Sequence, residues 1–292
     1  MSLTRTWLLA ARPKTLWAAI SPVLIGTAIA YADGFFHGPS ALAALLGAVC
    51  IQIGTNFSND YFDFIKGADT EERVGPIRAT QAGLVEPKTM RNASILVFAM
   101  AMVFGVYLVG RGGWVIVLIG LASILSGMFY TATRFALAYT GLADIFVLIF
   151  FGPVAVGGTY YVQALSISPV VLIAGIAPGL ISTAILTVNN LRDMKQDLAA
   201  GKNTMAVRFG KRFAQVEYLL SLFVACLIPV LLYAYTNTHF WSTAAFLTFL
   251  LAIPAVKLVF TFQESTELNE TLATTGKLLL CFSLIFSIGW LF

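Results

Sequence analysis

Carboxylate and amide side chains gather in a short segment at residues 56–63, where their spacing gives them common directions. Asn59 and Asp63 are four residues apart, and so are Asn56 and Asp60. Residues four apart lie on one face of a helix, so each pair stacks one above the other. Aligned oxygen ligands suit Mg²⁺, which proteins hold through one or two carboxylates while phosphate and water oxygens complete its coordination.

A second segment repeats this arrangement, because Asn189, Asp193 and Asp197 form one column at four-residue steps. Two such columns facing each other would hold metal on both sides of a diphosphate. Basic side chains nearby would contact the remaining diphosphate oxygens. The candidates for this role are Lys66, Arg73, Arg78, Arg192 and Lys202.

Helix capping is the competing interpretation of these polar residues. For a single Asp or Asn at a helix end, a cap or a solvated loop charge is an equally good explanation. It does not explain two Asn-x-x-x-Asp columns on apolar helices, because ionisable groups at such positions are costly unless they serve a function. The matching steps, each followed by Gly and then Thr, also indicate a duplication, although the rest of the two halves shows no repeat.

The elements that carry both segments are apolar enough to require a membrane. Hydrophobic residues make up 59% of the 292 residues and charged residues 11%, against roughly 45–50% and about 25% in soluble domains. Lipid is therefore expected to solvate much of the chain. The excess of 18 Lys and Arg over 14 Asp and Glu indicates basic cytoplasmic loops, and no nucleic-acid partner is expected.

Apolar runs of about 20 residues, the length that crosses a bilayer, provide the candidate helices. They span residues 15–33, 40–64, 90–111, 113–133, 139–163, 168–190, 214–235, 241–261 and 272–292. The sequence predicts an all-α, multi-pass bundle of about nine transmembrane helices with cytoplasmic caps, forming a single domain over residues 1–292. The start lacks a small-residue cleavage site, so the first run is expected to be a retained helix.

The distribution of Lys and Arg predicts the orientation in a cell inner membrane. With a cytoplasmic N-terminus, the inside segments and the helix ends beside them hold every Lys and Arg except Arg111. This asymmetry follows the positive-inside rule and predicts a C-terminus outside. The longest inside connections, 65–89 and 191–213, are expected to be ordered caps. The remaining inside segments are 1–14, 134–138 and 262–271.

Cysteine and histidine do not suggest a further metal site. Cys50, Cys226 and Cys281 lie in apolar runs without a CxxC pair, so neither a zinc site nor a disulfide framework is expected. His37 and His239 have no partner at ligand spacing.

Several longer motifs resemble the UbiA superfamily of intramembrane prenyltransferases. They are Arg12-Pro13-Lys14-Thr15-Leu16, Asn59-Asp60-Tyr61-Phe62-Asp63-Phe64 with Gly67 and Asp69-Thr70, Arg73-x-Gly75-Pro76-x-Arg78-Ala79-Thr80, and Asn189-Asn190-Leu191-Arg192-Asp193 with Asp197 and Gly201-Lys202. The similarity spans nearly the whole chain. It is greatest to the branch that prenylates 1,4-dihydroxy-2-naphthoate in menaquinone biosynthesis.

The resemblance implies an activity and a set of site residues. The activity is Mg²⁺-dependent transfer of a polyprenyl group from polyprenyl diphosphate to an aromatic acceptor, with the naphthoate carboxylate lost as CO₂. The implied metal ligands are Asn59, Asp60, Asp63, Asp69, Asp193 and Asp197. The expected substrate-binding residues are Asn56, Lys14, Arg73, Arg78, Asn189, Asn190, Arg192, Lys202 and Tyr130.

This chain departs from the superfamily pattern at one position. The first motif of the family often continues with an Asp where this chain has Gly67, and Asp69 is expected to take that place. The exact ligand set of the first motif therefore stays open.

Two polar residues at the membrane boundary have two interpretations each. Asp144 is included with Asn59, Asp63, Asp193 and Asp197 among the catalytic residues, as a group that orients the acceptor or receives its proton. It is equally explained as a helix-entry residue paired with Arg134. Lys14 could contact an acceptor carboxylate, or its side chain could snorkel to the interface.

Two other functional classes compete with naphthoate prenylation. Another branch of the superfamily would keep the mechanism but use 4-hydroxybenzoate, as in the ubiquinone pathway, homogentisate or a haem. A membrane transporter would also carry intramembrane carboxylates. The acidic residues gather at one membrane face rather than crossing the bilayer, which disfavours transport.

Overall fold

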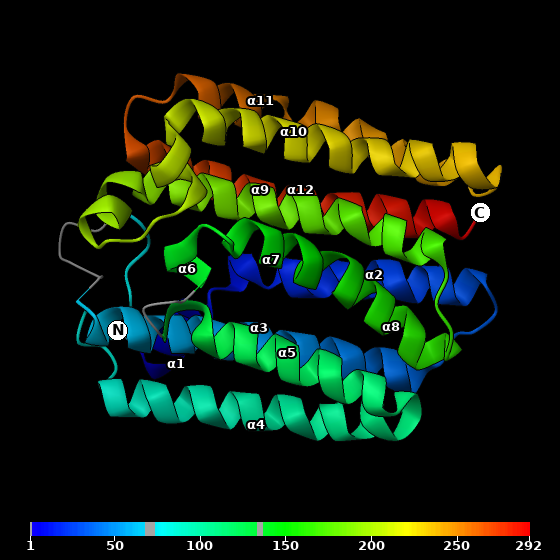
Figure 1. Cartoon of the computed structure of the whole chain (residues 1–292), viewed down its shortest axis with the longest axis horizontal. Coiled ribbons are helices and arrows are strands. Elements are labelled where there is room, and N and C mark those ends of the chain that lie inside the picture. Colours follow the sequence, from blue (N-terminus) through cyan, green and yellow to red (C-terminus); the bar gives the residue numbers. More distant parts are fainter. Residues whose placement is uncertain (1, 68–73, 133–136) are drawn as a thin grey trace.

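Long helices lie side by side along one axis of the molecule (Figure 1). The computed structural model describes residues 2–67, 74–132 and 137–292, with side chains throughout except at 128–132, 138 and 139. Every regular element within these ranges is a helix, so the all-α prediction is confirmed. The two ends of the chain lie at opposite ends of the bundle.

The helices follow one another in a simple order. They are α1 (Leu3–Ala11), η1 (Pro13–Thr15), α2 (Trp17–Ala32), α3 (Gly38–Ile65), α4 (Pro87–Gly112), α5 (Trp114–Ala132), α6 (Leu137–Thr140), α7 (Ala143–Ile149), η2 (Phe150–Val154), α8 (Ala155–Ala164), α9 (Pro169–Ala199), α10 (Met205–Thr236), η3 (Phe240–Leu247), α11 (Thr248–Thr261), η4 (Ser265–Glu267) and α12 (Leu268–Trp290). Elements η1, η3 and η4 are 3₁₀ helices, and η2 is a π-helical turn.

Each predicted membrane-spanning range contains a helix. Within the described residues, 7 spans are long and apolar enough to cross a membrane, and the bent pair α1–α2 makes up to 8 if it is one span. The remaining predicted range, 113–133, contains the shorter apolar stretch Trp114–Gly127 of α5. The chain is therefore a multi-pass membrane protein, and about nine spans is an approximate count.

The second polar segment lies on a helix, as its four-residue steps predict, and this helix extends beyond the predicted apolar run. The sixth apolar run was expected to end at residue 190, but α9 continues to Ala199. No Gly or Pro interrupts the chain between Gly179 and Gly201. Gly201 then adopts a positive φ of 70°, which is the usual way to end a helix. The predicted connection 191–213 is reduced to residues 200–204.

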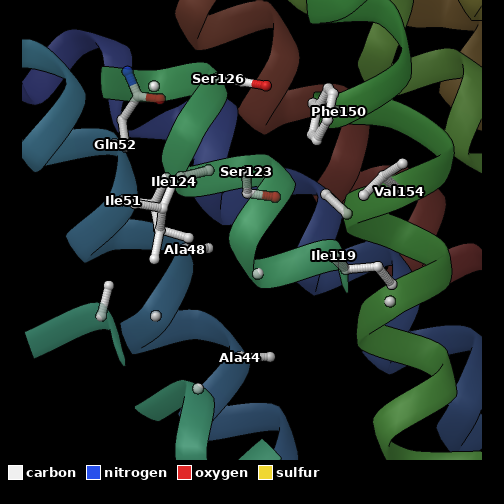
Figure 2. Close-up of a pocket in the computed structure, with 18 of the residues that line it drawn as sticks. Ala44, Ala48, Ile51, Gln52, Ile119, Ser123, Ile124, Ser126, Phe150 and Val154 are labelled. Carbon is white, nitrogen blue, oxygen red and sulfur yellow. The ribbon is translucent and has the colours of Figure 1, made fainter. Parts of the chain in front are cut away.

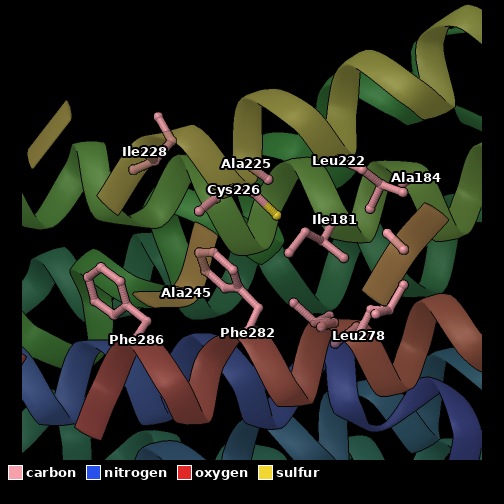
Figure 3. Packing of buried hydrophobic residues seen from close by; sticks show 14 of the residues in the cluster. Ile181, Ala184, Leu222, Ala225, Cys226, Ile228, Ala245, Leu278, Phe282 and Phe286 are labelled. Carbon is pink, nitrogen blue, oxygen red and sulfur yellow. The ribbon is translucent and has the colours of Figure 1, made fainter. Parts of the chain in front are cut away.

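The helices α9 to α12 enclose the larger apolar core (Figure 3). Phe282 and Phe286 of α12 face Cys226 of α10 across this core. Burial there is high, because 61% of the apolar window of α9 is covered by other parts of the chain, against 17% for α4. Helix α4 therefore presents most of its surface to lipid, while α9 is a central support for its neighbours.

Glycines let the α7–η2 segment approach α9 at backbone distance. A Cβ atom at Gly179 of α9 would lie 2.4 Å from the carbonyl oxygen of Leu148, and one at Gly152 would lie 2.7 Å from that of Gly175. Real Cβ atoms do not come so close to backbone, so larger residues would separate the two helices. This contact fixes α7 against α9.

Candidate active site

One lysine links the carboxylates of the two polar segments. Lys202 follows α9, and its Nζ atom lies 3.5 Å from Asp63 Oδ1 on α3 and 3.9 Å from Asp197 Oδ1 on α9. Arg78 Nη2 donates a hydrogen bond to Asp63 Oδ2 at 3.0 Å. Two acidic residues that are far apart in the sequence are thus brought to a common cation at one end of the bundle.

Asp193 is held by its own neighbour in the sequence. Arg192 donates from Nε and Nη2 to the two carboxylate oxygens of Asp193, both at 2.7 Å. The same guanidinium donates to Asn189 Oδ1 at 2.8 Å and to Asn269 Oδ1 at 3.0 Å. A two-pronged arginine–carboxylate contact of this kind is strong and fixes both partners in direction.

Asn269 of α12 extends this network and was not predicted. Its amide nitrogen donates to the backbone carbonyl of Val74 at 3.1 Å, so α12, α9 and the segment before Arg78 are tied together. An Asn close to the start of an apolar helix gives no signal of this role in the sequence.

Asp60, a predicted metal ligand, accepts hydrogen bonds from the backbone of the segment that carries Arg78. Its side chain is 0% exposed, and its two oxygens accept hydrogen bonds from the backbone N–H groups of Ala79 and Thr80 at 3.1 and 3.2 Å. Both oxygens are therefore occupied by backbone donors. Asp60 shapes the segment that carries Arg78 and so positions that guanidinium beside Asp63.

Asn56 links α3 to the break between α1 and α2 through two hydrogen bonds. Its amide nitrogen donates to Ala11 O at 2.9 Å and to Thr15 Oγ1 at 3.0 Å. Gln52, one turn earlier on α3, donates to the same hydroxyl at 3.4 Å. Helices α1 and α2 meet there at 51°, because Pro13 cannot donate a backbone hydrogen bond.

An apolar cavity of about 660 Å³ begins at the first polar segment and runs between α2, α3, α4, α5 and α7–α8. Asn56 and Asn59 line it together with many aliphatic and small side chains. Figure 2 shows how its α3 wall runs from Gln52 through Ile51 and Ala48 to Ala44. Asn59 also lies one turn before Asp63, so the polar cluster and the cavity are contiguous.

The cavity has polar and aromatic wall residues that the sequence did not identify as functional. Ser123 and Ser126 of α5 line it (Figure 2). Phe146 and Phe150 also line it, and their rings stack with centroids 5.9 Å apart and 9° between planes. The serines are three residues apart in an apolar run, which is a usable signal. The phenylalanines recur at a spacing that is equally typical of packing or lipid-facing residues, so the sequence gives no signal for them.

Several predicted site residues lie elsewhere or outside the described residues. Asp144 is not among the residues lining the cavity, and its side chain is 5% exposed. Lys14 is exposed in η1, and Asn190 is buried in α9. The predicted Asp69, Arg73 and Arg134 fall outside the described residues, as does the side chain of Tyr130.

Lys66 follows the end of α3, and its pKa is affected by the charges of the polar cluster. Partial burial lowers the pKa of its ammonium group, the negative charge of Asp63 opposes this, and the positive charge of Lys202 adds to it. Burial is the largest of the three causes, so Lys66 gives up its proton more readily than a fully solvated lysine.

The donor set suits Mg²⁺ bound together with a substrate. Among the described residues, no group of three or more His, Cys, Asp and Glu side chains forms a metal site by itself. Asp63 and Asp197 nevertheless share one cation, Lys202, and Asn59 adds an amide oxygen at the first-segment end. Few carboxylates completed by phosphate oxygens are the usual surroundings of Mg²⁺.

Comparisons with known proteins give consistent results. The model of the UbiA prenyltransferase family matches residues 19–290. A 1,4-dihydroxy-2-naphthoate octaprenyltransferase of Haemophilus influenzae is 36% identical over 98% of this chain and 96% of its own length. The protein of that name in Escherichia coli is 34% identical over 99% and 96%.

The fold is also found in solved structures. A UbiA homologue from Archaeoglobus fulgidus superimposes with a TM-score of 0.69 at 13% identity, covering 98% of this chain and 99% of that one. A structure of a UbiA homologue from that organism bound to DMAPP and Mg²⁺ gives a TM-score of 0.62 at 15% identity, covering 97% and 99%.

Proposed function

Since this chain belongs to the UbiA prenyltransferase family, we propose that it transfers a polyprenyl group from polyprenyl diphosphate to 1,4-dihydroxy-2-naphthoate, with loss of CO₂, in menaquinone biosynthesis. One observation carries the proposal: Lys202 joins Asp63 to Asp197, and Asp63 lies one turn of α3 beyond Asn59, which lines an apolar cavity. A diphosphate and an isoprenoid tail need such adjoining polar and apolar surroundings.

The polar cluster supports binding of the diphosphate. Asp63, Asp193, Asp197 and Asn59 are the residues that would hold Mg²⁺, which when bound supplies charge neutralisation for the diphosphate. Lys202 and the arginines donate to its oxygens. Nitrogen atoms of Arg78 and Lys202 both lie within 3.5 Å of Asp63. Positive and negative side chains therefore lie side by side where the polyprenyl diphosphate and the metal would meet.

These cations then promote departure of the leaving group. As the allylic C–O bond breaks, its electron pair stays with the diphosphate, and Lys202 and Arg78 stabilise the growing negative charge. The positive charge left on the allyl group faces an apolar wall. The faces of Phe146 and Phe150 attract such a cation through their negative quadrupoles, and the apolar lining excludes water that would quench it.

The electron-rich acceptor ring completes the transfer. The ring carbon that bears the ionised carboxylate donates an electron pair to the allylic carbon, and a C–C bond forms. The bond from this ring carbon to the carboxylate then breaks, its electrons restore the aromatic ring, and CO₂ leaves. Among the polar residues of the cavity wall, Gln52, Ser123 and Ser126 orient the hydroxyl groups of the acceptor.

The membrane arrangement belongs to the same proposal. We infer a single domain over residues 1–292, in the cell inner membrane, with the N-terminus and the polar cluster on the cytoplasmic side and the C-terminus outside. The placement of Lys and Arg supports this orientation. A cytoplasmic site receives a soluble aromatic acceptor from the cytosol while the donor tail stays in lipid.

The test is prenyl transfer by purified protein in nanodiscs with polyprenyl diphosphate and Mg²⁺. Dihydroxynaphthoate and 4-hydroxybenzoate are offered separately, and wild type is compared with Asp63→Ala and Asp193→Ala. Activity on dihydroxynaphthoate that requires Mg²⁺ and is lost in both variants is expected. Activity on 4-hydroxybenzoate alone would overturn the acceptor, and no transfer to either would overturn the proposal.

Asp33→Asn is the matched control for these variants. Asp33 directly follows α2, whose end lies at the opposite end of the bundle from the α9–α10 connection that carries Lys202 (Figure 1). Asp33 accepts a hydrogen bond from Tyr160 Oη at 2.7 Å. An Asn at this position keeps an acceptor oxygen for Tyr160 but removes a charge. Normal activity of Asp33→Asn would show that transfer is lost because the carboxylates of the candidate site are removed. It would exclude a general effect of replacing any acidic residue.

A further inference from the structure

A buried glutamine near the end of α8 ties this helix to α2 and α3. Gln163 lies in the last turn of α8 and is 3% exposed. Its Nε2 atom donates to Thr27 Oγ1 of α2 at 3.4 Å and to Thr159 O of α8 at 2.9 Å. Its Oε1 atom accepts from the backbone N–H of His37, the N-cap residue of α3, at 3.3 Å. Both the donor and the acceptor side of the Gln163 amide are therefore engaged.

Helix α4 joins the same network through its last two residues. Arg111 Nη2 donates to the backbone oxygen of Gln163 at 3.4 Å, and Tyr161 Oη donates to Gly112 O at 3.1 Å. The ends of α2, α4 and α8 lie at the end of the bundle opposite to the α9–α10 connection that carries Lys202 (Figure 1). We call these contacts around Gln163 the far-end network.

Arg111 is the exception in the distribution of positive charge. It is the one Lys or Arg outside the expected inside segments and the helix ends beside them. Its hydrogen bond to the backbone of Gln163 gives this isolated cation a definite place in the fold, which the positive-inside pattern does not explain.

The substrate cavity reaches this network from the inside of the bundle. Thr159 and Val162, which lie one turn before Gln163 and next to it, both line the cavity, as does Val109 near the end of α4. Gln163 itself is not among the lining residues. The far-end network therefore lies behind the cavity wall, and it joins α2, α3, α4 and α8, which all contribute to that wall.

The two ends of the cavity offer water very different surroundings. Asn56 and Asn59 line it at the first polar segment, whereas Val109, Ile116 and Val162 line it beside the far-end network. A water molecule is held only where several polar groups can bind it. The polar groups behind the far wall are already bound to one another, so they offer water no free partner.

We propose that Gln163 is a positioning residue that closes the far end of the substrate cavity to water. The closure is a property of the fold, and its chemical consequence rests on the proposed prenyl transfer. Water that reaches the allylic carbon forms a C–O bond to it and releases a proton, while the electron pair of the broken C–O bond stays with the diphosphate. The products are then polyprenol and diphosphate, and the acceptor is not prenylated.

The first experiment measures entry of water and requires no prenyl transfer. Cys50, Cys226 and Cys281 are replaced by alanine, and Val162→Cys places a thiol in the cavity wall beside Gln163. The protein in nanodiscs is treated with a positively charged methanethiosulfonate, which modifies hydrated thiols, and the adduct is followed by mass spectrometry. Addition of Gln163→Ala is expected to raise the rate of modification about tenfold, because the polar groups that it leaves unpaired bind water.

A milder variant and a matched control accompany this test. Gln163→Asn keeps an amide but is one methylene shorter, so it cannot reach α2 and α3 together, and a smaller increase of about threefold is expected. Thr236→Val removes a hydroxyl that donates to Leu232 O at 2.9 Å near the end of α10. Helix α10 contributes no residue to the described cavity wall, so this variant should be modified as slowly as the parent.

The second experiment measures the products of the reaction. Protein with its native cysteines is given polyprenyl diphosphate, Mg²⁺ and dihydroxynaphthoate in water labelled with heavy oxygen. Gln163→Asn is expected to form about threefold more labelled polyprenol for each prenylated product than wild type or Thr236→Val. A purely structural role of Gln163 would lower total turnover without changing this ratio.

The outcomes separate this proposal from the proposed function. Modification of Val162→Cys at one rate with and without the Gln163 substitutions, in protein shown to be folded by its thermal unfolding, would overturn the closure. An unaltered product ratio in active Gln163→Asn would also overturn it. Absence of prenyl transfer in wild type would overturn the proposed function alone, because thiol modification still reports whether Gln163 excludes water.

Discussion

The two polar segments repeat the same spacing but obtain their positive partners in different ways. In the first, Asp63 is paired with Arg78 and Lys202, which come from two separate connections. In the second, Asp193 is paired with Arg192, the residue next to it. One ion-pair network is assembled by tertiary structure, and the other is built into a single helix.

The repeat in the sequence also does not correspond to the pairing in space. Aligning Asn59 and Asp63 with Asn189 and Asp193 makes Asp63 and Asp193 equivalent. In the structure Asp63 shares its cation with Asp197, one helical turn beyond Asp193. Matching positions of the repeated spacing thus have different partners, because Asp193 pairs with its neighbour Arg192 whereas Asp63 lies at the junction of three segments.

The largest effect is expected at this junction. Asp63→Asn removes the charge shared by Arg78 and Lys202, and prenyl transfer should fall about 100-fold or more, as on loss of a principal electrostatic group. Removing one partner of a buried ion pair also costs about 3–5 kcal/mol of stability. Transfer kinetics and thermal unfolding in nanodiscs would measure both effects. Near-normal transfer by Asp63→Asn would contradict a special role for the ion-pair network that tertiary structure assembles around Asp63.

The next effect concerns the residue that shapes the first segment. Asp60→Ala removes two charge-assisted acceptors for backbone N–H groups, each worth about 1.5–3 kcal/mol. We expect a markedly lower unfolding temperature and weaker donor binding, because Arg78 is no longer held beside Asp63. Asp60→Asn keeps one acceptor oxygen and should recover part of the stability. Loss of Mg²⁺ dependence with unchanged stability would instead indicate a metal ligand.

Replacing each arginine by lysine distinguishes the two ion-pair networks experimentally. Arg192 makes a two-pronged contact with Asp193, whereas Arg78 makes one hydrogen bond to Asp63. Lysine cannot reproduce the two-pronged geometry. Arg192→Lys should therefore lower kcat/KM about tenfold, and Arg78→Lys should lower it less. Steady-state kinetics of both variants measure which of them lowers kcat/KM more. A larger loss in Arg78→Lys would contradict the view that the second network depends on the contact between Arg192 and its neighbour Asp193.

The smallest effect is a pH dependence at the first segment. Burial lowers the pKa of Lys66, so its positive charge is lost at a lower pH than that of a free lysine. If this charge assists donor binding, kcat/KM falls on the alkaline side as Lys66 deprotonates. Lys66→Arg keeps its charge, so the alkaline limb should move to higher pH. Superimposable pH profiles of the two proteins would exclude a contribution of Lys66.

Much of the fold could be predicted from residue patterns alone. Apolar runs of membrane length gave the helices, because a lipid solvent requires both apolar surface and internally satisfied backbone hydrogen bonds. The prediction ended the sixth run at residue 190 because it treated polarity as the end of a helix. Helix α9 continues to Ala199, because a change from apolar to polar side chains does not interrupt backbone hydrogen bonding.

The sequence by itself determined that the chain lies in a membrane, that it is helical, and which side chains could form a metal–diphosphate site. These properties follow from composition and from spacing along one helix. Only the tertiary structure decided that Asp60 anchors a loop and that Asp63 meets Asp197 at Lys202. Such partners come from segments far apart in the chain, and their approach depends on helix packing, which residue spacing does not encode.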